Sequence, residues 1–271
     1  MTSHLLTVDG IGPVEVTVTE RGQGRPILLL HGGGGPLTVT PWADLQAAHV
    51  LIPTHPGFNA TPRPAALDSI GGLAATYVAL LDALDLTDVT VVGNSIGGWI
   101  AAEMALLDPA RVGRYVLVDA VGIEVPGHPV ADFFALSPAE LAERSYHDPA
   151  TFGVDPARLP PPVREMMAGN RVTIEVYAGR AMTDPTLAGR LGGVTRPTLV
   201  VWGEADRIGD PDFGRAFAAA IPGAGFTLLP ETGHLPQIET PDALTAVVRE
   251  FMRDETQAAS ATRSRPAPLA S

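Results

Sequence analysis

Short apolar runs alternate with segments of helical spacing along most of the chain. Apolar runs that end at glycine or proline are typical of strands buried in a parallel sheet, whereas apolar residues three or four apart are typical of helices. The valines at 14, 16 and 18 alternate with polar residues, which indicates a further strand near the N-terminus. Strands alternating with helices predict an α/β fold, a mostly parallel twisted sheet with helices on both faces. The pattern predicts strands at 26–30, 49–52, 89–92, 115–118, 198–202 and 226–229, and helices at 70–84, 96–107 and 241–251.

Residues 124–190 break this alternation, because they are rich in proline and aspartate and contain only short helical patterns. A connection of about 65 residues is too long for an ordinary loop, and this one holds several aromatic and methionine side chains. We therefore expect a helical cap at 124–190, which interrupts a core formed by residues 1–123 and 191–253. From 254 to 271 the chain is dominated by Ala, Ser, Thr, Arg and Pro, which predicts a disordered tail.

The composition excludes several kinds of chemistry. The 271 residues include no cysteine and no lysine, so thiol nucleophiles, disulfides, cysteine metal sites and Schiff-base lysines are ruled out. The net charge is −12 and the acidic residues are scattered, which argues against nucleic acid and anionic membranes as partners. No basic segment followed by an apolar stretch begins the chain, and no apolar run reaches the roughly 20 residues of a membrane helix. A cytoplasmic location is the default expectation, and the sequence gives no indication of oligomeric state.

The first candidate for chemistry is Ser95, in the sequence Gly-Asn-Ser-Ile-Gly at 93–97. This pentapeptide lies between the expected strand 89–92 and the expected helix 96–107, which is the context that a G-x-S-x-G nucleophile requires. The serine then stands on a tight turn with its hydroxyl exposed at the carboxyl edge of the sheet. The alternative is a glycine-rich turn with an ordinary exposed serine, but the flanking strand and helix favour the nucleophile.

A nucleophilic serine needs a base and an acid that orients the base. His234 follows the strand at 226–229 and Asp206 follows the strand at 198–202, so both lie where ligands bind in open α/β sheets. Their order along the chain, Ser95 then Asp206 then His234, is the order of the nucleophile-elbow fold. Glu204 is the rival acid, two residues from Asp206. Four other histidines lie in no such context and are expected to have no catalytic role: His4, His49, His128 and His147. His31 and His55 lie beside glycine- or proline-rich loops and are expected to be structural.

A run of four glycines follows the strand at 26–30 and occupies positions 32–35. Such a loop can point a backbone N–H at a developing oxyanion, and the N–H of Ile96 beside the nucleophile would be the second donor. Phosphate binding is disfavoured, because the chain lacks both a P-loop lysine and a dinucleotide-binding G-x-G-x-x-G with its acid.

Taken together, these pieces resemble the α/β-hydrolases of the large Ser-Asp-His superfamily. The matching segments, spread over residues 26 to 253, are HGGGG at 31–35, PGFNAT at 56–61, GNSIGGW at 93–99, WGEADR at 202–207 and GHLPQIETP at 233–241. The resemblance implies an α/β-hydrolase fold with a helical cap, Ser95 as nucleophile, His234 as base, Asp206 as acid, and Gly33 and Ile96 as oxyanion donors. It is strongest to the branch that contains carbon–carbon bond hydrolases of aromatic ring-cleavage pathways and small esterases.

The expected function is that of a serine hydrolase that cleaves a small, largely apolar carboxylic ester, lactone or thioester through an acyl-enzyme, without metal or organic cofactor. Carbon–carbon hydrolysis of a ring-cleavage dienoate is the first alternative, although such enzymes usually carry Trp where this chain has Leu235. Arg164, Arg171 and Arg180 of the cap could bind a substrate carboxylate, but exposed helix charges are the commoner role for arginine. A ligand-binding homologue without turnover and a cyclisation catalyst are further alternatives. The residues expected to line the pocket are Gly34, Phe58, Trp99, Phe133, Phe134, Met167, Tyr177 and Leu235.

Overall fold

An eight-stranded sheet runs through the molecule, with strand order β1-β2-β4-β3-β5-β6-β7-β8. The structure is a computed structural model, and it describes residues 1–263. The first two pairings, β1 with β2 and β2 with β4, are antiparallel, and all later pairings are parallel. The strands are β1 (Thr2–Val8), β2 (Gly12–Arg21), β3 (Pro26–Leu30), β4 (His49–Thr54), β5 (Val89–Asn94), β6 (Val112–Val118), β7 (Thr198–Gly203) and β8 (Gly225–Leu229).

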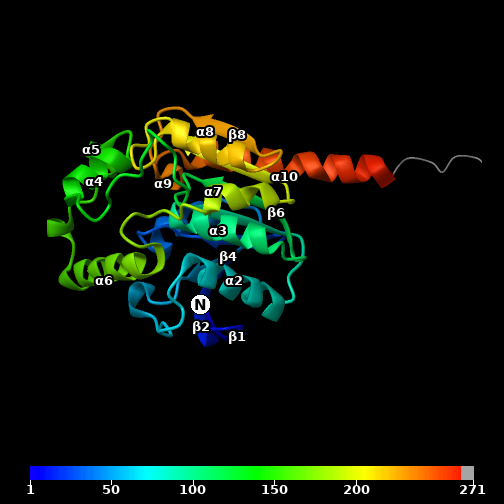
Figure 1. Ribbon diagram of the computed structural model, residues 1–271, viewed down its shortest axis with the longest axis horizontal. Helices are drawn as coiled ribbons and strands as arrows, with labels where there is room; N and C mark the ends of the chain where they lie inside the picture. The colour runs from blue at the N-terminus through cyan, green and yellow to red at the C-terminus, as the bar shows by residue number, and fades with distance from the viewer. Residues whose placement is uncertain (264–271) are drawn as a thin grey trace, which may run out of the picture.

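Helices cover both faces of this sheet, as the alternation of strands and helices predicts (Figure 1). Helices α2 (Ile70–Ala83), α3 (Ile96–Leu107) and α8 (Pro211–Ala220) pack on one face, and α1 (Thr40–Asp44) and α10 (Pro241–Arg263) pack on the other. Ser69 caps the start of α2, where its side chain accepts the N–H of Gly72. The short helix α9 (Pro236–Glu239) precedes α10, and four 3-10 turns lie at Pro36–Thr38, Phe58–Ala60, Pro156–Arg158 and Leu191–Gly193.

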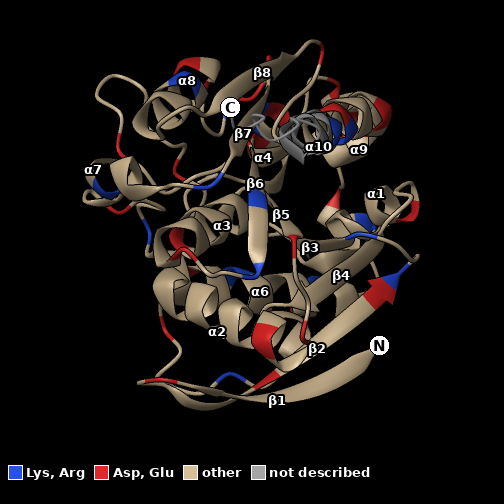
Figure 2. Ribbon diagram, turned by 90° about the vertical axis from the view of Figure 1, so that its right-hand side faces the viewer, with Lys and Arg blue, Asp and Glu red and all other residues tan. Residues whose placement is uncertain are grey.

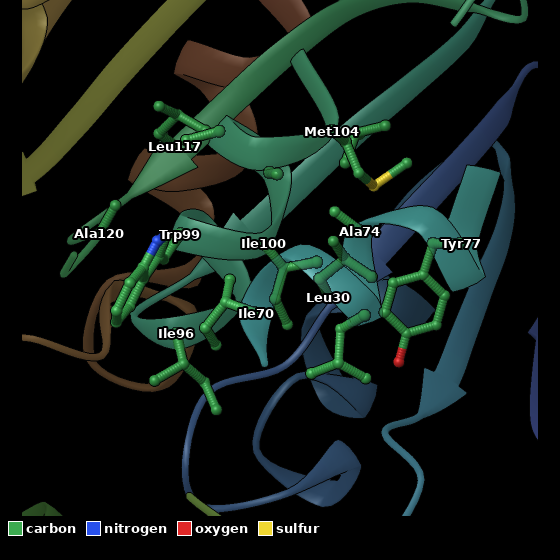
Figure 3. Close-up of a cluster of buried hydrophobic side chains, with 14 of the residues drawn as sticks. Leu30, Ile70, Ala74, Tyr77, Ile96, Trp99, Ile100, Met104, Leu117 and Ala120 are labelled. Atoms are coloured by element: carbon green, nitrogen blue, oxygen red, sulfur yellow. The ribbon is translucent and has the colours of Figure 1, made fainter. Parts of the chain in front are cut away.

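Each central strand is buried on both sides, which explains its continuous apolar sequence. Along β3, Leu28 and Leu30 enter the core beneath α2 and α3, and Ile27 and Leu29 enter the opposite core beneath α1 and α10. Figure 3 shows part of the first core, in which side chains of α3 pack between the sheet and α2. The sheet therefore holds the ends of its strands rigidly, and those ends carry the candidate chemistry.

Residues 124–190, where we expect a cap, contain helices α4 (Pro138–Ser145), α5 (Pro149–Phe152) and α6 (Pro161–Ala178), which lie to one side of the core in Figure 1 and are called the cap below. The following helix, α7 (Leu187–Arg190), belongs with the core instead. Leu187 is fully buried in the core cluster, and Arg190 forms an ion pair with Glu103 of α3 at 2.6 Å. The core therefore begins before the boundary at 190 that the sequence pattern suggested.

Two strands differ from the sequence-based expectation. The strand β1 was not expected, because only Leu6 and Val8 of this edge strand are buried and its pattern is correspondingly weak. The strand β4 continues through Pro53, which pairs with Val18 of β2 beyond the last parallel pairing with β3. A proline at that point interrupts no hydrogen bond to β3, so the strand is not stopped there.

Helix α10 continues to Arg263 and so includes residues 254–263 of the segment in which we expect a disordered tail. The sequence from 254 to 263 contains three alanines and neither glycine nor proline, so it offers no reason for the helix to end. The remainder of the predicted tail, residues 264–271, lies outside the described residues. Acidic and basic residues are scattered over the elements rather than gathered on one (Figure 2). Within residues 1–263 no helix has the length and apolar character needed to span a bilayer.

Candidate active site

Ser95 stands on a sharp turn between β5 and α3, with φ 57° and ψ −119°. A residue other than glycine in such a conformation costs about 1–3 kcal/mol, and this strain is common at functional sites. The turn is tight because α3 approaches β3 closely: a Cβ atom on Gly97 would lie 2.2 Å from the carbonyl oxygen of Leu30. The N–H of Ser95 donates to the carbonyl of Val118 at 3.0 Å, which fixes the turn to the end of β6.

The predicted base and acid are hydrogen-bonded to each other. The Nδ1 atom of His234 lies 2.8 Å from Oδ2 of Asp206, and both side chains are buried. The other oxygen of Asp206 accepts the N–H of Ile208 at 2.7 Å. Since a carboxylate can only accept, Nδ1 carries the proton and Nε2 is left as the basic nitrogen. Glu204, the rival acid, is exposed, and one of its oxygens receives the N–H of Glu231 at 3.4 Å.

Asn94, the residue before Ser95, connects the serine turn to the histidine loop. Its Nδ2 donates to the carbonyl of His234 at 3.0 Å, and its Oδ1 accepts from Nε2 of Gln237 at 3.1 Å. On the other side of the same residue, the N–H of His234 donates to the carbonyl of Ser145 in the cap at 2.7 Å. The backbone of His234 is therefore hydrogen-bonded to the core through its carbonyl and to the cap through its N–H.

The glycine loop passes directly beside the nucleophile. A Cβ on Gly32 would lie 3.1 Å from Cβ of Ser95, and a Cβ on Gly33 would lie 2.8 Å from Cδ1 of Ile174 in α6. The predicted donor Gly33 thus lies between the serine turn and the cap. Ile96 is the first residue of α3, so its N–H has no partner within the helix and is free to face an oxyanion.

A buried hydrogen-bond network supports this loop from below. The backbone N–H of His55 donates to Nε2 of His31, so Nδ1 of His31 carries the proton and donates to the carbonyl of Gly32 at 2.7 Å. Nε2 of His55 donates to the carbonyl of His31 at 2.9 Å, and its Nδ1 accepts the hydroxyl of Tyr77. Both histidines are thus neutral, each in one tautomer, in agreement with the structural role expected for them.

One acidic residue of this site was missed by the sequence analysis. Asp119 follows β6 directly, is fully buried, and accepts the N–H of Gly203 at 2.8 Å through Oδ1. Burial, and next the charge of Asp206, raise the pKa of Asp119 well above its usual range. The sequence did offer a signal for this residue: Asp119 directly follows the strand expected at 115–118, and so lies at the same edge of the sheet as Asp206.

Asp119, Asp206 and His234 are also the one group of ligand-type atoms among residues 1–263 that could hold a metal ion, with those atoms within 4.8 Å of one another. Four of these atoms already take part in hydrogen bonds: Oδ1 of Asp119, both oxygens of Asp206 and Nδ1 of His234. N–H groups of Gly203 and Ile208 point at the two carboxyls, and His234 binds Asp206 directly. Donors aimed at the carboxyls suit a chain of hydrogen bonds better than a cation.

The residues predicted to line the pocket lie in varied surroundings. Phe58 packs edge-on against His31 and is fully buried, and Trp99 is buried against the backbone of Gly122. Tyr177 is buried and donates its hydroxyl to the carbonyl of Pro56 at 2.8 Å. The others range from half-buried to exposed: Phe133, Phe134 and Leu235 are half-buried, and Gly34 and Met167 are exposed.

The three arginines of the cap are bound to other groups of the cap. Arg171 lies over the ring of Phe133 at 4.7 Å and donates to the carbonyl of the same residue at 2.8 Å. Arg180 lies 5.4 Å from the ring centre of Phe134 and is exposed. Arg164, also exposed, donates to a main-chain carbonyl in the preceding loop. None of the contacts given above joins one of these three arginines to Ser95, Asp206 or His234.

The cap is fastened to the core at two places. On one side, three residues on one face of α6 bond the loop at 56–60: Asn170, Thr173 and Tyr177. On the other side, the carboxylate of Glu239 accepts the N–H groups of His147 and Asp148 from the cap, at 2.9 and 3.1 Å, and that of Gly233 from the histidine loop at 2.6 Å. The sequence analysis identified none of these contacts.

Comparison with known proteins identifies the family to which the chain belongs. Residues 27–247 match the model of the alpha/beta hydrolase family. A 2-hydroxy-6-oxo-6-phenylhexa-2,4-dienoate hydrolase from Burkholderia cepacia is 28% identical, over 93% of this chain and 96% of that protein. A thermophilic esterase from Thermogutta terrifontis, solved with malate bound, superposes with a TM-score of 0.75 at 24% identity, over 93% of this chain and 98% of the esterase. An N-acyl homoserine lactone degrading enzyme superposes with a TM-score of 0.68 at 25% identity, over 92% and 100% of the two chains.

Proposed function

The chain belongs to the alpha/beta hydrolase family, and on that premise we propose that it is a serine hydrolase of small, largely apolar carboxylic esters, lactones or thioesters. The observation that carries this proposal is the pairing of a strained serine turn with a buried His–Asp hydrogen bond, tied together by Asn94. In this arrangement Ser95 is the nucleophile, His234 the base and Asp206 the acid.

The reaction follows from the placement of these groups. The Oγ of Ser95 attacks the substrate carbonyl while Nε2 of His234 takes the hydroxyl proton. The carboxylate of Asp206 stabilises the imidazolium, and the N–H groups of Gly33 and Ile96 bind the oxyanion. The tetrahedral intermediate collapses, the imidazolium gives its proton to the leaving alkoxide or thiolate, and an acyl-enzyme remains. Water then attacks the acyl carbon, with the same histidine as base, and releases the acid.

The cap supports an uncharged substrate. A guanidinium is the strongest side-chain partner for a substrate carboxylate, and Arg171 already donates to a carbonyl and lies over an aromatic ring. Leu235, next to the base, offers apolar contact without an aromatic face, and Ile174 places further apolar surface over the glycine loop. An ester needs only polarisation of one carbonyl, which the loop and α3 supply. The 25% identity to the lactone-degrading enzyme is consistent with a cyclic ester as substrate.

Carbon–carbon bond hydrolysis is the second candidate, because curated relatives over most of the chain are dienoate hydrolases. Besides the Burkholderia enzyme, a 2-hydroxymuconate semialdehyde hydrolase from Pseudomonas putida is 29% identical, over 87% of this chain. In that reaction the same triad would serve, but the bond cleavage leaves a dienolate that the site must also protonate. The substrate would carry a carboxylate, and the contacts that Arg171 already makes with Phe133 disfavour its use as the partner of that carboxylate.

Side-by-side kinetics test the choice between the two candidates. We expect kcat/KM for a short p-nitrophenyl or alkyl ester to exceed that for a ring-cleavage dienoate, with burst release of the aryl alcohol as the acyl-enzyme forms. A preference for the dienoate by about tenfold or more would overturn the ester proposal in favour of carbon–carbon cleavage. Binding of both compounds without turnover of either would overturn the enzymatic proposal altogether.

A further inference from the structure

The carboxyl group of Asp119 has one oxygen that the surrounding protein does not satisfy. Its Oδ1 accepts the N–H of Gly203, but its Oδ2 is buried and has no hydrogen-bond partner among the described residues. Polar atoms of Asp119, Asp206 and His234 all lie within 4.8 Å of one another. A buried polar atom without a partner is rare, so this oxygen needs an explanation.

A proton on Asp119 supplies that explanation. Two ionised carboxylates close together in a buried site repel each other strongly, so such a pair retains one proton. The donors around the pair show where the proton resides. Asp206 accepts two hydrogen bonds, from Nδ1 of His234 and from the N–H of Ile208, whereas Asp119 accepts only one. Because each donor favours the ionised form, Asp206 is the carboxylate and Asp119 is the acid.

We propose that Asp119 is a protonated positioning residue of the triad, which donates a hydrogen bond from Oδ2 to the carboxylate of Asp206 and becomes the reserve acid when Asp206 is lost. This proposal rests on the proposed function, since the reserve role is defined by His234 as the base. In the intact enzyme the bond holds the carboxylate of Asp206 in place. In an Asp206→Asn variant, Asp119 no longer has a carboxylate neighbour, so it ionises and supplies the negative charge that the imidazolium requires.

The charged and titratable groups around Asp119 agree with a neutral acid at this position. Asp206 faces it from the loop after β7, His234 from the loop after β8, and Glu239 from α9. Burial is the largest cause that raises the pKa of Asp119, and the charges of Asp206 and Glu239 act in the same direction. The N–H of Gly203 acts in the opposite direction and is outweighed.

Infrared spectroscopy tests the proton without reference to activity. At pH 7 the wild-type protein should show the carbonyl stretch of a buried protonated carboxylic acid, and Asp119→Asn should remove it. Asp9→Asn, which changes an exposed aspartate, is the matched control and should leave the band in place. A wild-type spectrum in which no such band depends on Asp119 would overturn the protonated state, whether or not the protein hydrolyses any substrate tested.

Kinetics test the positioning and the reserve role. Asp119 has a φ of 45°, which glycine and asparagine tolerate, so Asp119→Gly removes the carboxyl without backbone strain and Asp119→Asn imitates the protonated acid. We expect Asp119→Gly to lower kcat by about tenfold and Asp119→Asn to restore most of that loss, since the amide can donate the same bond. In an Asp206→Asn background, the additional change Asp119→Asn should lower kcat by about another tenfold or more.

Three results would overturn the kinetic part. The first is equal kcat, within about twofold, for Asp206→Asn with and without the additional Asp119→Asn change, for proteins that circular dichroism shows to be folded. The second is a loss in Asp119→Asn as large as that in Asp119→Gly, because the amide would then fail to replace the acid. The third is unchanged kcat in Asp119→Gly. If the wild-type protein turns over neither esters nor dienoates, the proposed function fails, while the infrared result still decides the protonation of Asp119.

Discussion

His31 and His55 stack on each other with ring centroids 3.7 Å apart, fully buried beneath the glycine loop of the candidate oxyanion site. Burial lowers the pKa of His31 well below its usual value, and it lowers that of His55 to about 4. Both rings are therefore still neutral near pH 6.5, where an exposed histidine is about half protonated. The hydrogen bonds of the loop depend on that neutrality, because each ring uses one nitrogen as an acceptor.

Acid should destabilise the protein through this pair. In the unfolded chain His55 binds a proton near pH 6.5, but in the folded protein it does so only near pH 4. Between these values the unfolded state binds more protons, so the free energy of unfolding falls as the pH drops from about 6.5 towards 4. For His55 the loss is on the order of 3 kcal/mol. Urea unfolding at pH 7 and pH 5 should show about 2 kcal/mol of this loss, since the remainder appears only as the pH approaches 4.

His55→Gln is the variant that isolates this effect, because the glutamine amide can accept from Tyr77 and donate to the carbonyl of His31 without titrating. Its stability should depend less on pH than that of the wild type, whereas His147→Gln, which changes an exposed histidine, should behave as the wild type. Equal pH dependence in His55→Gln and the wild type would contradict the assignment.

Ser95→Ala should abolish turnover, by about 10³-fold or more, and change the free energy of unfolding by less than about 1 kcal/mol. The fold survives because alanine loses one hydroxyl and keeps the same strained turn. A fluorophosphonate probe and mass spectrometry check the assignment: the wild type should be labelled at Ser95, and a His234→Ala variant should react far more slowly. Label on another serine, or undiminished labelling of Ser95→Ala, would refute it.

Asp206→Asn should lower kcat by about 10²–10⁴-fold, since the base loses the carboxylate that holds its tautomer and stabilises its charge. Glu204→Gln is the matched control, because Glu204 is exposed and solvent screens its charge. Steady-state assays on one activated ester compare the two variants. A larger loss in Glu204→Gln than in Asp206→Asn would assign the acid to Glu204 instead.

Glu239→Gln should loosen the cap. The carboxylate accepts hydrogen bonds from three main-chain N–H groups. Glutamine replaces one of its oxygens by an NH2 group, which is a donor and cannot accept a hydrogen bond from a main-chain N–H. Loss of such a charged hydrogen bond costs about 1.5–3 kcal/mol, so limited proteolysis should cut the cap faster and kcat should fall. Glu143→Gln, an exposed change on α4, is the control, and equal proteolysis of the two variants would count against this role for Glu239.

The sheet and its strongest motif were predictable because their sequence signals are local. The apolar run at 26–30 reflects burial on both faces, and the turn at Ser95 needs glycine close to the serine along the chain. The sequence favours Asp206 over Glu204 as the acid but does not decide between them, since both acids follow the same strand. Burial of one and exposure of the other separates them.

Other features depend on contacts between distant segments, for which the sequence carries no local signal. Asp119 is one acid among the 30 of the chain, and only the pairing of Val118 with Val201 brings the end of β6 beside the end of β7. Glu239 acts on main-chain groups of the cap, which every residue type carries. The direction in which Arg171 points is likewise set by the neighbouring ring of Phe133.

The bond between the N–H of His234 and the carbonyl of Ser145 joins the cap to the base through main-chain atoms alone. Nearly any amino acid at position 145 would present the same carbonyl, so mutation there can change the side chain and leave the link intact. The cap of this chain can therefore change in sequence, and with it the shape offered to substrates, while its main-chain link to His234 stays the same. One peptide group thereby separates the part of the molecule that is free to vary from the part whose position must be kept.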